Sequence, residues 1–158
     1  MKNDISKLSV RLLFKGLKLV TVESCTGGWI GKTVTDLAGS SAWFEAGFIT
    51  YSNQAKTKLV NVPESLLEKY GAVSLEVADA MAKGALDSFP ESISVAVTGV
   101  AGPDGGTREK PVGTVCIASA YKNKIKARKF LFEGNRNDIR EQTVHEAIEM
   151  VLSMEALS

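Results

Sequence analysis

The sequence contains few of the residues from which disulfide frameworks and zinc sites are built. Its 158 residues include two cysteines, Cys25 and Cys116, which lie far apart and outside any CxxC pair, and one histidine, His145. Small disulfide-bonded folds and zinc sites both need several such residues at short spacings. We therefore expect reduced thiols in a cytoplasmic protein, with no cofactor and no catalytic metal. A magnesium site made only of carboxylates would leave no such pattern.

The sequence also has little net charge and no long hydrophobic run. Its 19 Lys and Arg residues against 18 Asp and Glu residues give a formal charge of +1, which is too small to draw the chain onto nucleic acid or an anionic membrane. Lys15, Lys18 and Glu23 interrupt the most hydrophobic early stretch, so no segment approaches the roughly 20 apolar residues that cross a bilayer. We expect a soluble protein with no direct nucleic-acid or membrane partner, and a small charged substrate is compatible with this balance.

The remaining pattern predicts one domain of the α/β class. With 44% hydrophobic residues and no repeat, linker or low-complexity segment, residues 1–158 are expected to share a single core. Apolar spacings of three and four residues predict helices, and short β-branched runs predict strands. Helices are expected over 5–14, 29–37, from 52 past 59, 63–70, 74–86 and 136–154, and strands over 17–22, 43–51, 93–98, 112–121 and 124–132. This order predicts a mixed, mostly parallel sheet with an antiparallel hairpin.

Two glycine-bearing loops follow strands of the expected sheet. The first contains Thr26, Gly27 and Gly28, and the second contains Thr98, Gly99, Gly102, Gly105 and Gly106. Neither loop fits GxxxxGK[ST] or opens with GxGxxG. Because ligands usually bind where parallel strands end, and glycines let backbone amides approach an anion, these residues are candidate substrate-binding positions. The alternative is two tight turns that need positive φ.

Ser24, at the start of the first loop, is a candidate nucleophile. Its hydroxyl would be exposed beside backbone amides that could stabilise an oxyanion. A helix cap is the commoner use of a serine in such a position. Cys25 is a rival nucleophile, because a helix N-terminus lowers a thiol's pKa, although most buried cysteines are inert. Spacing in the sequence does not decide between them.

A serine nucleophile needs a base, and His145 lies in the middle of the last expected helix, where a surface role is more usual than catalysis. The alternative base is a lysine held neutral by burial, with a tyrosine to relay the proton. Tyr51 and Lys56 flank an expected strand-to-helix junction and are the candidates. By residue type alone, a lysine in such a position is more often solvated at the surface, and a tyrosine at the end of a strand more often packs in the core.

Two groups of basic residues are candidates for binding anions. Arg136 and Arg140 lie four residues apart at the start of the last expected helix, on one face, and a guanidinium suits a phosphate. Solvated surface arginines are more frequent. Residues 122–129 include five Lys and Arg side chains on the expected hairpin. This cluster fits nucleic-acid binding less well than a charged edge strand that discourages aggregation.

Six runs of the sequence resemble, in order, the signatures of the CinA C-terminal domain family. They are TVESCTGG (21–28), AGSS (38–41), GFITYSN (47–53), GAVS (71–74), TGVAGP (98–103) and KPVGTV (110–115). Together they extend the resemblance over nearly the whole chain, roughly from Val10 to Leu152. Six ordered runs are far more specific than either glycine loop alone.

The resemblance implies a three-layer α/β/α fold and hydrolysis of the carboxamide of nicotinamide mononucleotide to nicotinate mononucleotide and ammonia, without a metal. The family's serine, lysine and tyrosine match Ser24, Lys56 and Tyr51, and folding is expected to bring the amine and the phenol within hydrogen-bonding reach of the Ser24 oxygen. Longer relatives carry an additional N-terminal domain with pyrophosphatase-like activity, so the chain resembles the stand-alone deamidase.

As a hypothesis, neutral Lys56 accepts the Ser24 proton, amides of the first loop stabilise the oxyanion, and Tyr51 relays a proton to the leaving nitrogen. The substrate's phosphate is expected at residues 102–106 or at Arg136 and Arg140. Self-association through the hairpin predicts a homo-oligomer. Two other functions stay open: an interaction module linked to competence and recombination, and a hydrolase of another small amide.

Overall fold

A five-stranded sheet forms the middle of the molecule. In this computed structural model, which describes residues 1–158, the strands stand in the order β2-β1-β3-β4-β5. Their bounds are β1 Leu19–Glu23, β2 Phe44–Ile49, β3 Ile93–Gly99, β4 Thr114–Tyr121 and β5 Lys124–Leu131. β1 pairs in parallel with both β2 and β3, whereas β4 is antiparallel to β3 and to β5. β4 therefore runs opposite to the other four strands, and the expected mixed sheet with its hairpin is confirmed.

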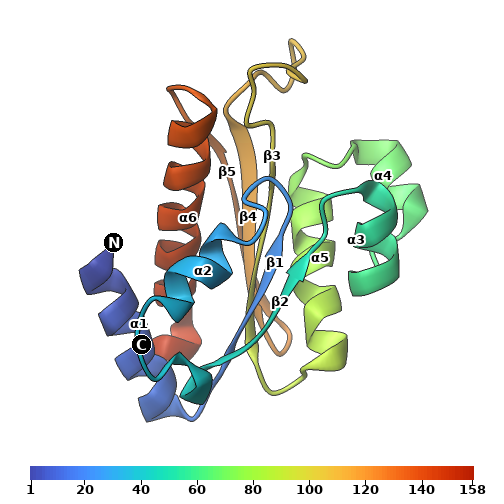
Figure 1. Cartoon of the computed structure of the whole chain (residues 1–158). Coiled ribbons are helices and arrows are strands. Elements are labelled where there is room, and N and C mark those ends of the chain that lie inside the picture. Colours follow the sequence, from blue (N-terminus) through green and yellow to red (C-terminus); the bar gives the residue numbers. More distant parts are fainter.

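Helices cover both faces of this sheet. Their bounds are α1 Lys2–Lys15, α2 Trp29–Thr35, α3 Asn53–Val60, α4 Glu64–Tyr70, α5 Leu75–Ser88 and α6 Arg136–Leu152, with short 3-10 turns at Ser40–Ala42 and Glu155–Leu157. Figure 1 shows α1, α2 and α6 on one face and α3, α4 and α5 on the other. The three-layer α/β/α architecture implied by the resemblance is confirmed. No helix of the chain is long and apolar enough to pass through a membrane.

The alternation of side chains along the strands divides the core in two. Val95 and Val97 of β3 pack into the cluster under α1, α2 and α6, while Ala96 between them packs into the cluster under α5. Successive residues of a strand point to opposite faces, so a strand buried on both sides reads as a continuous apolar run. This explains why residues 93–98 do not alternate between apolar core positions and polar solvent-facing positions.

The expected elements are all present, with differences at their ends. α1 begins at Lys2 instead of residue 5, and α6 ends at Leu152, two residues earlier than expected. Pro63 does not lie within the first turn of α4; it is the N-cap, with extended backbone angles of φ −61° and ψ 132°. A proline lacks the N–H that a helix needs but tolerates this flanking position.

The fold brings the two glycine loops to the same edge of the sheet. Because β1 and β3 are parallel neighbours, Glu23 at the end of β1 lies opposite Val97. The backbone N–H of Ser24 then donates to the carbonyl of Val97 at 3.2 Å. Residues that follow β1 and β3 therefore line one cavity, as ligand sites in open α/β sheets usually do.

Candidate active site

Ser24 lies directly beyond β1 and is nearly buried, with 8% of its surface exposed. Its hydroxyl oxygen accepts a hydrogen bond from Lys56 Nζ at 3.1 Å. The N-cap of the following helix α2 is Gly28, and the free N–H groups at that helix end donate to Glu23, not to the Ser24 hydroxyl. The alternative in which Ser24 is a helix cap is therefore wrong, and its hydroxyl faces an amine instead.

Lys56 is the largest charged side chain in the interior, with 2% of its surface exposed. Its amine donates to Ser24 Oγ and to the carbonyl of Thr50, each at 3.1 Å, and it forms no salt bridge. Lys56 lies in the first turn of α3. The Ser52 side chain caps the start of this helix by accepting from the N–H of Ala55. The position is the interior of the site, not the solvated surface.

Burial lowers the pKa of Lys56 below the ordinary value for lysine, and the nearby Cys25 opposes part of this shift. Desolvation disfavours the charged form of an amine. A neutral amine has a lone pair, so the contact with Ser24 can also run with the hydroxyl donating to nitrogen. The pair thus has the arrangement that a lysine general base requires.

Tyr51 lies at the same cavity but does not touch Ser24. Its side chain is 61% exposed, and its phenol oxygen accepts from Arg136 Nη2 at 3.3 Å. No hydrogen bond joins it to Ser24 or to Lys56. The expected three-way contact is therefore wrong for Tyr51, because the chain turns into α3 immediately after it and points the ring toward solvent and α6.

Cys25 is buried beside Ser24, with 7% of its surface exposed. Desolvation raises the pKa of its thiol to about 12, with smaller opposing effects from its own backbone, Arg140 and Lys56. The thiolate that would attack a carbonyl is disfavoured there. Cys25 is the weaker of the two candidate nucleophiles.

His145 lies on α6, where its side chain is 44% exposed and 4.0 Å from Asp4. It lines a different hollow, together with Met1 and Phe132. The expectation that the one histidine lies at the surface is confirmed.

Glu23 is a residue of the site that the sequence reasoning missed. Its carboxylate is 2% exposed and accepts five hydrogen bonds. The donors are Thr26 Oγ1 at 2.7 Å, the N–H of Ile30 at 2.8 Å, the N–H of Gly31 at 3.0 Å, the N–H of Gly28 at 3.2 Å and Thr21 Oγ1 at 3.3 Å. The anion at the start of α2 is thus the protein's own carboxylate, and the Thr26 hydroxyl and Gly28 amide are already engaged.

Arg140 holds the first loop from the other side. Its Nε and Nη2 donate to the carbonyls of Cys25 and Thr26 at 3.0 and 2.9 Å, and its guanidinium lies 5.2 Å from the ring centre of Trp29. The N–H of Gly27 donates to the carbonyl of Ser24 at 3.1 Å and closes a four-residue turn. The N–H groups of Cys25 and Thr26, in the middle of this turn, donate to no other residue.

Only part of the second loop reaches the cavity. Thr98, Gly99 and Ala101 line it, whereas Gly105 and Gly106 do not. Gly102 has a φ of 78°, and its carbonyl accepts from Arg136 Nη1 at 2.6 Å. The alternative of a turn that needs glycine fits Gly102 and Gly105, whose φ is 89°.

The cavity has a volume of about 240 Å³. It is enclosed by Ser24 and Cys25, Tyr51, Asn53 and Lys56, Ala72 and Val73, Thr98, Gly99 and Ala101, and Arg136. Polar and apolar residues thus line the hollow together, which is the usual composition of a small-molecule site. Of these lining residues, Asn53 begins α3 and was not singled out from the sequence.

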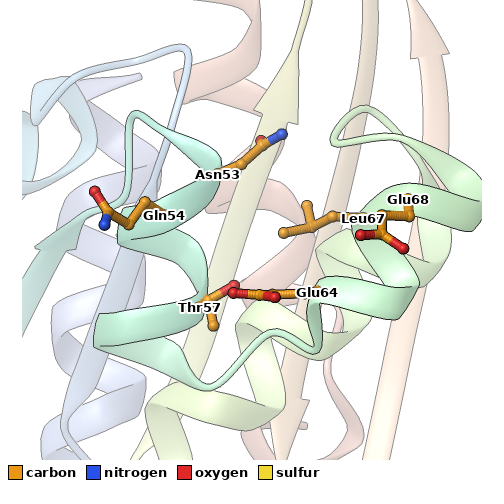
Figure 2. Close-up of a pocket in the computed structure, with 6 residues that line it drawn as sticks. All are labelled: Asn53, Gln54, Thr57, Glu64, Leu67 and Glu68. Carbon is orange, nitrogen blue, oxygen red and sulfur yellow. The ribbon is translucent and has the colours of Figure 1, made fainter.

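A second hollow of about 330 Å³ lies next to this cavity and shares Asn53 with it. Figure 2 shows its lining side chains projecting from α3 and α4: Asn53, Gln54, Thr57, Glu64, Leu67 and Glu68. Two carboxylates and no basic side chain line it. This acidic hollow disfavours a phosphate, whereas Arg136 stands at the other cavity.

Comparison with known proteins gives the same family throughout. The CinA C-terminal domain model matches residues 2–154. The nicotinamide-nucleotide amidohydrolase PncC of Escherichia coli K12 is 48% identical over 136 residues, covering 85% of this chain and 82% of that protein. A CinA-like protein of Geotalea uraniireducens is 55% identical over 79% of this chain but only 30% of its own length. The chain thus spans about a third of the CinA-like relatives it matches.

Solved structures agree with this assignment. The competence/damage inducible protein CihA of Agrobacterium tumefaciens has a TM-score of 0.88 at 42% identity, covering 95% of this chain and 94% of that chain. A CinA superfamily protein of Escherichia coli has a TM-score of 0.91 at 37% identity, covering 95% of this chain and 87% of that chain. The chain belongs to the CinA C-terminal domain family.

Proposed function

We propose that this chain hydrolyses the carboxamide of nicotinamide mononucleotide to nicotinate mononucleotide and ammonia, as a step of pyridine nucleotide recycling. The observation that carries the proposal is the buried Lys56 amine 3.1 Å from the Ser24 hydroxyl, inside a cavity at the carboxyl ends of β1 and β3. The relationship to an amidohydrolase that acts on nicotinamide nucleotides supports the substrate.

In the first half of the reaction, Ser24 Oγ attacks the amide carbon while Lys56 Nζ takes the hydroxyl proton. A lysine can do this only when its amine is neutral, which its burial favours. The carbonyl oxygen becomes an oxyanion, and we assign to it the N–H groups of Cys25 and Thr26, which donate to no other residue.

Collapse of this intermediate breaks the carbon–nitrogen bond. The nitrogen needs one proton to leave as ammonia, and Lys56 holds the proton taken from Ser24. We assign Tyr51 to relay it, because Tyr51 and Lys56 line the same cavity and the Tyr51 O–H is free to donate. No hydrogen bond joins the two side chains, so the relay requires the bound substrate to bridge them. Water then attacks the acyl carbon and Lys56 takes its proton; as the bond from the acyl carbon to Ser24 Oγ breaks, Lys56 returns that proton to Oγ and the acid departs.

The substrate's phosphate is assigned to the α6 side of the cavity. Arg136 lines the cavity and Arg140 lies four residues along the same helix, whereas Glu64 and Glu68 line the hollow on the α4 side. Guanidinium groups suit phosphate oxygens and carboxylates repel them. Thr98 and Gly99 are left to contact the nicotinamide and ribose parts.

Ammonia release separates the candidate nucleophiles. With nicotinamide mononucleotide as substrate, Ser24→Ala and Lys56→Ala are expected to lower kcat at least about a thousandfold, since each removes a member of the catalytic pair. Cys25→Ala is expected to stay within about fivefold of the parent, because the thiol stays protonated and only its packing is lost.

The proposal fails if Cys25→Ala abolishes turnover while Ser24→Ala retains it. A parent protein that releases ammonia from nicotinamide or from other small amides, but not from the nucleotide, would keep the catalytic pair and change the substrate. A parent protein that is inactive on all of them would favour the interaction-module alternative.

A further inference from the structure

We propose that Glu23 is a positioning residue, whose buried carboxylate fixes the turn after β1 so that the amides of Cys25 and Thr26 face the reacting carbonyl. The inference rests on the proposed function, because it assigns to those amides the oxyanion of amide hydrolysis. Glu23 itself touches no substrate in this assignment and acts only through the turn.

Burying a carboxylate costs free energy, so the groups that hydrogen-bond to Glu23 show which parts of the chain the carboxylate holds in place. Glu23 is 2% exposed and forms no salt bridge with Lys or Arg. Burying an unpaired charge is expensive unless hydrogen bonds satisfy it. Five donors do so here, three on Oε1 and two on Oε2. All the acceptor capacity is directed at the loop, at the start of α2 and at β1, and none of it at the cavity.

This arrangement does more than cap α2. An ordinary capping side chain comes from the N-cap residue itself, but the N-cap is Gly28, and Glu23 reaches it from the end of β1, five residues earlier. The carboxylate thus ties the end of the strand to the start of the helix. The intervening turn, Ser24 to Gly27, is held at both of its ends.

Arg140 supplies the complementary half of this restraint. It binds the carbonyls of Cys25 and Thr26, and in a trans peptide the N–H points away from the C=O of the same unit. The N–H of Thr26 therefore points away from Arg140. Successive amides left free in the middle of such a turn form a concave anion-binding group.

Loss of the charge at Glu23 should therefore damage the chemical step more than substrate binding. Glu23→Gln keeps the shape and one acceptor oxygen but presents N–H groups to Gly31 and Thr21. We expect kcat for ammonia release to fall about 10- to 100-fold, as when oxyanion donors are misplaced, while KM changes by less than about threefold. Asp36→Asn is the matched control, because it neutralises an exposed carboxylate just beyond the other end of α2 and is expected to change neither constant.

A label that reacts without the nucleotide tests the turn separately from the substrate. A fluorophosphonate forms a bond from phosphorus to Ser24 Oγ as the phosphorus–fluorine bond breaks, fluoride leaves and Lys56 takes the hydroxyl proton. Intact mass should show labelling of the parent, none in Ser24→Ala, and at least about tenfold slower labelling in Glu23→Gln. If Glu23→Gln does not fold, Thr26→Val removes the shortest of the five contacts and is expected to react more slowly than Thr26→Ser.

The outcomes distinguish the two proposals. If the parent takes the label but does not hydrolyse the nucleotide, the proposed function is wrong and the labelling rates still decide the role of Glu23. If Glu23→Gln merely lowers the unfolding temperature and keeps the parent's kcat and labelling rate, Glu23 is only structural and the positioning role is overturned. A parent that neither labels nor turns over overturns both.

Discussion

At the scale of single residues, the candidate site depends on an amine that is kept away from every carboxylate. Lys56 contacts Ser24 and the carbonyl of Thr50, while Glu23, the buried acid at the end of β1, accepts from donors of its own. An ion pair would hold the amine in its charged form. The separation of these two groups is what the proposed role of Lys56 as a base requires.

This separation has a consequence for the pH dependence of the reaction. In the proposed mechanism only neutral Lys56 accepts the Ser24 proton, so kcat/KM should rise with pH through the pKa of Lys56 and be lost as the amine becomes protonated. Because burial lowers that pKa, the rise should lie below the ordinary lysine value of about 10.4. A pH series of ammonia release measures it.

Two variants identify the group responsible for that rise. Lys56→Arg keeps the cation but cannot deprotonate, and should abolish turnover at every pH. Cys25→Ala should keep the rise and move it, if at all, to lower pH, because the thiol's own pKa is raised to about 12 and Cys25 acts to raise the pKa of Lys56. A profile that flattens in Cys25→Ala would assign the titration to the thiol and contradict the proposed base.

Single residues also show where sequence reasoning reaches its limit. Ser24 and Lys56 are 32 positions apart and on different elements, so no spacing rule joins them. Local reasoning made each a candidate beside a commoner structural role, and only the resemblance favoured the catalytic role for both. The same resemblance did not reveal that the Tyr51 ring turns toward Arg136. Glu23 was missed because a carboxylate at the end of a strand usually reads as solvated. Only the donors brought in by α2 make its burial tolerable.

At the scale of elements, the position of α3 determines where Lys56 lies. Gly84 of α5 makes the close approach of these helices possible. A Cβ atom added at Gly84 would overlap the carbonyl of Val60, the last residue of α3. The glycine is therefore a contact point and not a weak position in the helix.

Gly84→Ala should accordingly lower the free energy of unfolding by about 1–3 kcal/mol through overpacking. In an open helix the same change would raise it by about 1 kcal/mol. Gly31→Ala in α2 is the matched change, because its nearest neighbours would be Glu23 Oε2 at 3.5 Å and Phe44 Cζ at 3.6 Å, ordinary contacts. Urea unfolding of the two variants should give opposite signs, and equal effects would contradict the packing argument.

Elements could be predicted better than their ends. The sequence predicts helix starts at 52 and 74 and a hairpin turn at 122–123; in the structure Ser52 and Ser74 are the N-caps of α3 and α5, and the turn lies where it is expected. Pro63 was placed one position too far into its helix. Proline is common in the first turn and is also tolerated just before it, so the residue type alone does not fix the first residue of the helix. Helix ends depend on tertiary contacts that local patterns do not contain.

At the scale of the whole molecule, the strand order lay beyond local pattern. Nothing within 17–22 indicates that β1 lies between β2 and β3, yet that placement joins the two glycine loops. The right-handed connection of parallel strands restricts the choices without selecting one. The family resemblance predicted the architecture. The pairing of β1 with β3 in the structure shows where the cavity lies.

The free edges of the sheet bear on self-association, which stays a prediction. β2 and β5 are the two edge strands, and β5 combines a basic outer face with Leu131, which is 66% exposed. If the hairpin mediates a homo-oligomer, light scattering should give a mass that is a multiple of 16.9 kDa, and Leu131→Glu should reduce it. A monomeric parent at high concentration would contradict the prediction.

The distribution of charge around the cavity predicts how the substrate is oriented. Arg136 and the acidic hollow of α4 approach the cavity from opposite faces of the sheet. Arg136→Ala should therefore raise KM for nicotinamide mononucleotide about 10- to 100-fold, the loss expected for a charge-assisted hydrogen bond to phosphate. The riboside, which lacks the phosphate, should lose much less. Arg136→Ala also removes the contacts of Arg136 with Tyr51 and Gly102. Any fall in kcat that results from this loss should be the same for both substrates.

The ratio of the two KM values isolates the phosphate contact from those other effects. Arg128→Ala removes the same charge from the edge hairpin, where the guanidinium lies 5.1 Å from the Phe130 ring centre, and should leave the ratio unchanged because salt screens a distant surface charge. Equal losses for nucleotide and riboside in Arg136→Ala would mean that this arginine only supports the second loop and Tyr51. The phosphate would then have to bind elsewhere, since Arg140 spends its Nε and Nη2 on the first loop.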